Sequence, residues 1–132
     1  MRTVARVLAG VIALLYLIFG ARYMFAPAGV METAGLEAVS FLGMATVRGL
    51  IGGGFLAFGI LLVMHTVVNQ ETGALRFAIL HLLMTIVGRV VSVFADGSDS
   101  SSLFNFVPVT LMLIVSIISL VMFLRSEPDG KS

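Results

Sequence analysis

The stretch GLIGGGFLAFGILLVMHTVVNQ, residues 49–70, decides the fold class of this chain. It has 22 residues and contains no Asp, Glu, Lys or Arg. At a rise of about 1.5 Å per residue, a helix of this length is about 33 Å long, which matches the hydrocarbon core of a bilayer. It therefore predicts a membrane-spanning helix, which we place at residues 45–68 with its flanks.

A second apolar stretch lies near the N-terminus. Residues 7–21 carry no charge and are bounded by Arg6 and Arg22. Because arginine side chains can extend toward the membrane surface, the predicted helix covers residues 3–25. Pro27 ends it, since the residue before a proline disfavours helical geometry.

Two further apolar stretches follow. Residues 76–95 predict a third span, which contains His81 and Arg89, and residues 103–124 predict a fourth. Short polar connections make successive helices antiparallel neighbours. The sequence thus predicts an all-α fold, a polytopic four-transmembrane-helix bundle running up-down-up-down as a single domain over residues 1–132.

The composition excludes several classes of protein. Of the 132 residues, 59% are hydrophobic and 11% are charged, whereas an average soluble domain carries about 25% charged residues. An ordinary soluble globule and a disordered tail are therefore excluded. The net charge of +1 provides no basic face for nucleic acid. The absence of cysteine excludes disulfide scaffolds, thiolate metal sites and cysteine catalysis.

Basic residues predict the orientation. The side with both termini carries Arg2, Arg6, Arg76, Arg125 and Lys131, and the other side carries Arg22, Arg48 and Arg89. The positive-inside rule therefore predicts that both termini are cytoplasmic. Two alternatives stay open. The small bias permits dual topology, and Ala26-Pro27-Ala28 after the first apolar stretch resembles a signal-peptide cleavage site.

Small side chains recur on one face of each of the first two spans. In the first span the face consists of Ala5, Ala9, Ala13, Tyr16, Gly20 and Tyr23. In the second span Gly49, Gly53 and Ala57 repeat every four residues, and Gly52 and Gly59 are seven apart. This spacing favours close helix packing in lipid. For Gly52-Gly53-Gly54, a segment that cradles a ligand remains the alternative.

Polar side chains of the third span share one face. His81, Thr85 and Ser92 lie with Arg89 and Asp96 within about 100° of each other, so this stripe is expected to face the bundle interior. The fourth span offers a partner stripe of Asn105, Pro108, Met112, Ser116 and Ser119. His81 is interpreted as a hydrogen-bonded structural group, with a metal or haem ligand as the alternative. We expect no metal and no cofactor.

Three arginines belong to the outer helix ends. Arg22 and Arg89 lie near helix C-termini, which favour cations, whereas Arg48 lies near an N-terminus and needs an anion. The candidate cluster is Arg22, Arg48, Arg89, Asp96 and Glu37. Two interpretations are open: an ion-pair network with the outer carboxylates, including Glu32, or a site for an anionic head group.

Two stretches carry a family resemblance. VRGLIGGG at residues 47–54, followed by AFG at residues 57–59, and GRVVSVFADG at residues 88–97 resemble the signature stretches of domain-of-unknown-function family 4345. This bacterial membrane family is similar in layout to the DoxX/DoxD-like four-helix proteins. The resemblance implies four helices, a bacterial inner membrane and an uncharacterised role. DoxX-like relatives include subunits of quinone-linked redox complexes. A likeness in fold alone does not imply that this chain has the same role.

These observations favour a non-enzymatic structural or accessory subunit, because no catalytic constellation is found. The alternative is a module that binds an anionic lipid or a quinone-type head group at the outer arginines. The expected partners are membrane lipid and either a homo-oligomer or a larger membrane complex, and nucleic acid is not expected.

Overall fold

In this computed structural model the described residues are 1–34, 36, 41–96 and 106–126. They form helices and connections and contain no strand, which confirms the all-α prediction for this part of the chain. The elements are α1 (Arg2–Phe25), α2 (Pro27–Thr33), α3 (Phe41–Thr46), η1 (Val47–Gly52), α4 (Gly53–Leu61), η2 (Leu62–Val68), α5 (Gly73–Asp96) and α7 (Phe106–Arg125).

Three helical stretches of the described chain are long and apolar enough to cross a membrane. They are Arg2–Phe25, Gly43–Val68 and Val107–Arg125, with 24, 26 and 19 residues. The second runs through α3, η1, α4 and η2, and both η segments are wider, π-helical turns within one continuous helix. The third predicted span falls on α5, whose apolar part is shorter, Gly73–Gly88.

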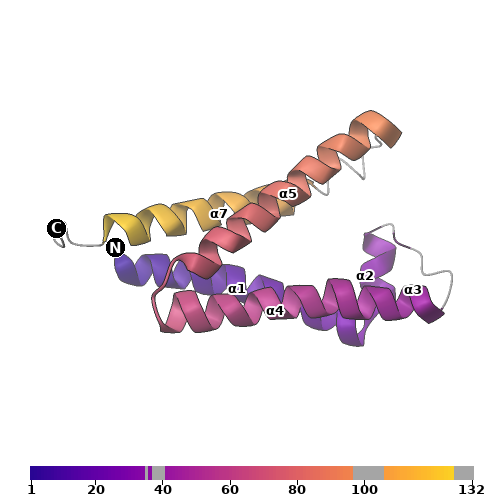
Figure 1. Cartoon of the computed structure of the whole chain (residues 1–132), viewed down its shortest axis with the longest axis horizontal. Coiled ribbons are helices and arrows are strands. Elements are labelled where there is room, and N and C mark those ends of the chain that lie inside the picture. The colour runs from indigo at the N-terminus through magenta and orange to yellow at the C-terminus, as the bar shows by residue number, and fades with distance from the viewer. Residues whose placement is uncertain (35, 37–40, 97–105, 127–132) are drawn as a thin grey trace.

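The helix α1 occupies the centre of the bundle. It packs against α4, η1 and η2 on one side and against α7 on another. Figure 1 shows that the start of α1 and the end of α7 lie at the same end of the molecule, and that α5 leans away from α1 and α4 toward its own C-terminus. Two long-range hydrogen bonds hold the end with the termini together: Arg6 Nε donates to Val67 O at 3.0 Å, and Ser119 Oγ donates to Ala5 O at 2.8 Å.

The buried face of α1 is the one that its small residues predicted. Its buried residues are Ala5, Ala9, Ile12, Ala13, Tyr16, Gly20 and Tyr23, which confirms the seam and adds Ile12. The opposite face exposes large apolar side chains, among them Val7, Leu14 and Ile18. Exposed apolar side chains on a long helix are typical of contact with lipid, where no water must be excluded.

The glycine seam of the second span differs from part of the prediction. A Cβ on Gly52 would lie 2.8 Å from Met24 N, and one on Gly59 would lie 2.7 Å from the Leu17 side chain. These two glycines therefore face α1. A Cβ on Gly49 would meet nothing within 4 Å and Ala57 is exposed, so the predicted seam is wrong at these two positions, whereas a Cβ on Gly53 would lie 3.8 Å from Met24 Cε of α1. The glycines spaced seven residues apart, Gly52 and Gly59, therefore lie along the contact with α1, and the repeat of four that begins at Gly49 does not.

The helix α2 closes the end opposite the termini. As predicted, Pro27 ends the first span: α1 stops at Phe25, and Pro27 is the first residue of the new helix. Val30 and Met31 of α2 are buried with Tyr23, and these three pack against Met44, Val47, Ile51 and Phe55. The helix α2 is not predicted from the sequence, because seven residues are too few for a clear apolar period.

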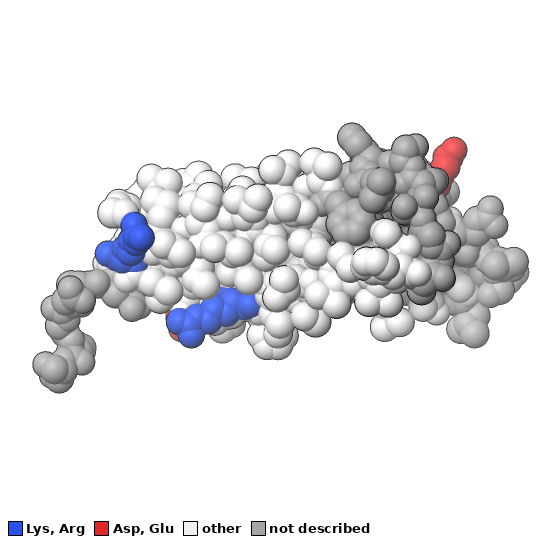
Figure 2. Space-filling model, turned by 90° about the horizontal axis from the view of Figure 1, so that it is seen from above, with Lys and Arg blue, Asp and Glu red and all other residues white. Residues whose placement is uncertain are grey.

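Charge is distributed unevenly along the long axis. On the face seen in Figure 2, basic side chains lie in the half that carries the termini, an acidic side chain lies at the opposite end, and the described surface between them is uncharged. Such an uncharged middle with charges toward the ends is typical of a helical membrane protein.

Candidate functional site

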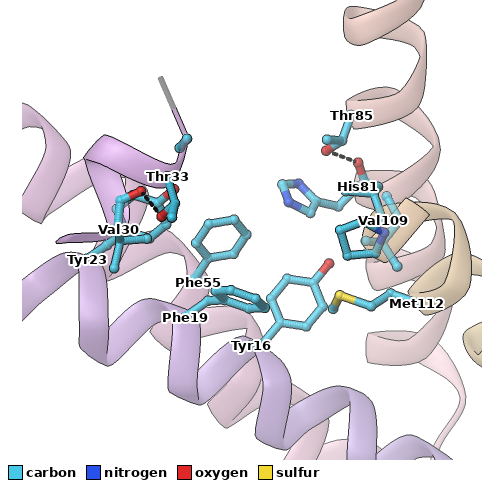
Figure 3. Close-up of a pocket in the computed structure, with 13 residues that line it drawn as sticks. Tyr16, Phe19, Tyr23, Val30, Thr33, Phe55, His81, Thr85, Val109 and Met112 are labelled. Carbon is cyan, nitrogen blue, oxygen red and sulfur yellow. Dashed lines mark hydrogen bonds between the residues drawn. The ribbon is translucent and has the colours of Figure 1, made fainter. Parts of the chain in front are cut away.

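A cavity lies in the half of the bundle that faces away from the termini. Its volume is about 290 Å³, near the lower end of the range for small-molecule sites. Figure 3 shows the cavity between α1 and α2 on one side and α5 on the other. Its lining residues, which define the Tyr16 pocket, are Tyr16, Phe19, Tyr23, Val30, Thr33, Ala34, Phe55, His81, Leu82, Thr85, Pro108, Val109 and Met112.

A cluster of rings forms the floor of the Tyr16 pocket. The ring of Tyr16 lies with its centroid 5.7 Å from that of Phe55, 5.8 Å from that of Phe58 and 5.9 Å from that of His81. The imidazole of His81 packs on Phe58 at 4.8 Å with 31° between the planes. Offset and tilted ring pairs of this kind fix ring orientations. The cluster therefore holds Tyr16 and His81 in defined positions.

The hydroxyl of Tyr16 has no hydrogen-bond partner within the described residues, although the residue is only 1% exposed. Figure 3 shows the hydroxyl pointing into the space below His81. A buried tyrosine hydroxyl usually finds a partner, because leaving it without one costs about 1–3 kcal/mol. This oxygen is therefore the most unusual polar atom of the pocket.

The two threonine hydroxyls of the pocket are bonded within their own helices. Thr85 Oγ1 donates to His81 O at 2.9 Å, one helical turn back along α5. Thr33 Oγ1 lies 3.0 Å from both Gly29 O and Val30 O in α2. No Asp, Glu, Lys or Arg is among the described lining residues. The pocket thus presents rings and aliphatic side chains with a few uncharged polar atoms.

The candidate arginines lie elsewhere. Arg22 is exposed in the last turn of α1, and Arg48 Nη1 donates to Met24 O at 3.1 Å. A cation is favoured there, because the unpaired carbonyls of a helix C-terminus carry partial negative charge. Arg48 therefore finds its electronegative partner at the end of α1. Glu37 lies outside the described residues, as do the side chains of Arg89, Asp96 and Ser92, whose backbones belong to α5.

Two residues of the polar stripe of α5 reach the pocket. His81 and Thr85 line the cavity together with Tyr16 of α1. The partner stripe of α7 contributes Pro108 and Met112 to the lining, while its Ser116 and Ser119 are buried nearer the termini. The structure therefore brings His81 and Thr85 of α5 to the cavity beside the ring cluster.

With this geometry described, the family assignment can be made. Residues 4–122 match the family described as Domain of unknown function (DUF4345). The chain belongs to this family. No curated protein and no solved structure matches it. Gly52 and Gly59 of this DUF4345 protein are the glycines of the second helix that approach α1 most tightly.

Outside the pocket, one histidine of the described part of this DUF4345 protein lies against a carboxylate. His65 Nδ1 lies 2.8 Å from Glu71 Oε2, and both side chains are largely exposed at the end with the termini. Among the described residues, no three His, Cys, Asp or Glu side chains come together as metal ligands. His65 lies against Glu71, whereas His81 packs on Phe58.

Sequence reasoning missed the Tyr16 pocket. It placed Tyr16 and Tyr23 in a packing seam, where both are indeed buried, and it did not treat either hydroxyl as functional. A signal was present in the sequence. The chain has only two tyrosines, and both lie on a helix face whose other predicted members are alanine and glycine. Their meeting with His81 and Phe55 depends on tertiary packing, which no local pattern reveals.

Proposed function

We propose that this DUF4345 protein crosses a bacterial inner membrane four times as an antiparallel bundle with both termini in the cytoplasm. Three stretches are long and apolar enough to span, and α5 has 24 residues, a length of about 36 Å. The basic residues near the termini support the orientation. The fourth crossing is α5. It begins at the end of the molecule where α1 starts and runs toward the opposite end (Figure 1), so it extends between the same two ends as the other spans.

The function that the geometry supports best is the binding of a small, uncharged, lipid-soluble molecule in the Tyr16 pocket. One observation carries it: a cavity of about 290 Å³ lies among helices of the bundle, and no charged side chain is among its described lining residues. A charged ligand would be unpaired there, and an isolated charge in an apolar environment is very costly. An uncharged ligand is not penalised in this way, and it reaches the pocket from the lipid phase.

We prefer this pocket to the outer arginines as the binding site. Arg22 and Arg48 are exposed, and Arg48 is already bonded to Met24 O. An exposed cation gains little from a single anion in water. The pocket surrounds a ligand on several sides, and removing apolar surface from water in this way is what drives the binding of apolar molecules. In this proposal the protein acts as an accessory membrane subunit that holds or presents its ligand.

The experiment enlarges one lining side chain at a time, so that it occupies part of the pocket, and measures how ligand binding changes. Decalin, an uncharged two-ring hydrocarbon, is titrated calorimetrically into the purified protein in detergent. Val109 lines the pocket, whereas Val107, on the same helix, is 49% exposed and does not. We expect Val109→Phe to weaken decalin binding at least tenfold and Val107→Phe to leave it unchanged.

A second filling variant guards against misfolding. Ala34 lines the pocket from the end of α2 and is itself exposed, so Ala34→Phe is expected to weaken binding without disturbing the bundle core. Thermal unfolding of each variant establishes that it is folded. If the wild type does not bind decalin, or if the filling variants bind it as well as Val107→Phe does, the proposed function is wrong.

A further inference from the structure

The hydroxyl of Tyr16 distinguishes the Tyr16 pocket from a simple apolar cavity. It is buried at the level of the membrane interior and has no partner among the described residues. The two threonine hydroxyls of the pocket donate elsewhere: Thr85 Oγ1 donates to His81 O, and Thr33 Oγ1 lies against carbonyls of α2. In hydrocarbon, no solvent satisfies such a group. The O–H of Tyr16 is therefore available as a donor inside the cavity.

The shape of the cavity limits what meets this donor. Phe55 and Phe58 flank Tyr16 with centroid distances of 5.7 and 5.8 Å, and His81 stands over the same space. Ring faces favour contact with other ring systems over extended chains. A volume of about 290 Å³ equals that of roughly ten water molecules, which is enough for a compact two-ring compound.

We propose that the ligand of the Tyr16 pocket is an uncharged lipophilic ring compound bearing a carbonyl-type oxygen, and that this oxygen accepts a hydrogen bond from the hydroxyl of Tyr16. This inference rests on the proposed function and adds the chemical class of the ligand. The oxygen is an acceptor because the group that lacks a partner is a phenol, which donates readily. Tyr16 is then the residue that selects ring ketones and related compounds over hydrocarbons.

The experiment compares two ligands of nearly the same shape, decalin and 1-decalone, which differ by one carbonyl. Their affinities for the wild type and for Tyr16→Phe are measured calorimetrically in the same detergent. The ratio of the two affinities is compared between proteins, so that partitioning of each ligand into micelles cancels. We expect Tyr16→Phe to lower the preference for 1-decalone about tenfold and to leave decalin binding nearly unchanged.

A spectroscopic readout identifies the hydrogen bond itself. The carbonyl stretch of bound 1-decalone is expected to move to lower frequency in the wild type and to return toward its value in hydrocarbon in Tyr16→Phe. The chain has no tryptophan and two tyrosines, both of which line the pocket, so near-ultraviolet difference spectra of tyrosine report on this site alone. Tyr23→Phe removes the other tyrosine hydroxyl of the pocket, so a loss of preference and of the carbonyl shift in Tyr16→Phe but not in Tyr23→Phe assigns the donor to Tyr16.

The possible outcomes separate the two proposals. If decalin does not bind the wild type, the proposed function fails, and this inference fails with it. If both ligands bind, are displaced by Val109→Phe, and show the same preference in the wild type and in Tyr16→Phe, only this inference is overturned. If Tyr23→Phe rather than Tyr16→Phe removes the preference and the carbonyl shift, the assignment of the donor to Tyr16 is wrong.

Discussion

Gly20 of α1 and Leu56 of α4 approach so closely that a Cβ on Gly20 would lie 2.6 Å from the backbone nitrogen of Leu56. The same Cβ would lie 3.0 Å from the carbonyl oxygen of Gly52. Both obstructing atoms are backbone atoms, which cannot rotate away as a side chain does. The contact therefore fixes the separation of the two helices at the level of the Tyr16 pocket, because Gly20 lies one helical turn beyond Tyr16.

The first prediction concerns this contact. Gly20→Ala is expected to destabilise the protein by about 1–3 kcal/mol, because the added methyl group forces two backbones apart. Denaturant unfolding in mild detergent measures the loss. The matched control is Gly54→Ala, since a Cβ at Gly54 meets nothing within 4 Å. Alanine there is expected to be neutral or to stabilise the helix by up to about 1 kcal/mol. Equal losses in both variants would contradict the packing described.

The second prediction concerns the hydrogen bond from Ser119 to Ala5 O, which is buried and joins α7 to α1. Ser119→Ala is expected to lower stability by roughly 0.6–1 kcal/mol, the range for such bonds between membrane helices. Ser126→Ala serves as the control, because Ser126 Oγ is bonded to Met122 O one turn back in its own helix. Unfolding curves that coincide for the two variants would show that the link between helices contributes nothing.

Part of this fold could be predicted from the sequence because the relevant rules are local. The face of α1 that packs is the face with the small side chains, and six of its buried residues follow from spacing alone. Spacing did not decide which glycines of the second helix pack. Gly49 and Gly52 each begin a regular repeat of small residues, but only Gly52 contacts α1. The π-helical turns around Gly52 change the angular relation between residues, and no sequence period encodes them.

The third prediction concerns lipid. Arg22 and Arg48 are both exposed near the last turn of α1, where a lipid phosphate is able to reach them. Phosphatidylglycerol is expected to raise the melting temperature of the wild type more than phosphatidylcholine does, and this difference is expected to shrink in the double variant Arg22→Gln/Arg48→Gln. A difference of the same size in both proteins would rule out these arginines as the anionic-lipid site.

The fourth prediction concerns topology and uses the absence of cysteine from the chain. Single cysteines are placed at Glu32, which is exposed in α2, and at Glu71, which is exposed in the connection before α5. In intact cells, a membrane-impermeant maleimide is expected to label Glu32→Cys, and to label Glu71→Cys only after the membrane is opened. Labelling of both positions in intact cells would indicate dual topology.

The candidate site was less predictable than the fold. The polar face of α5 could be read from the sequence, and two of its residues, His81 and Thr85, do line the cavity. What they face could not be read, because Tyr16, Phe55 and His81 belong to three different helices whose relative rotation depends on packing. The outer arginines are candidate site residues because charge is rare in such a sequence. A phenol without a hydrogen-bond partner cannot be recognised until its surroundings are known.

The bond between Ser119 and Ala5 joins residues that are 114 positions apart. A ribosome adds about 5–20 residues per second, so roughly 6–23 s pass between the synthesis of the two partners. During this interval the alanine face of the nascent first helix lacks its partner from the last one. The bundle therefore closes only after residue 119 has been synthesised, and a chain that stops before this residue leaves that part of the alanine face of α1 without its partner from α7.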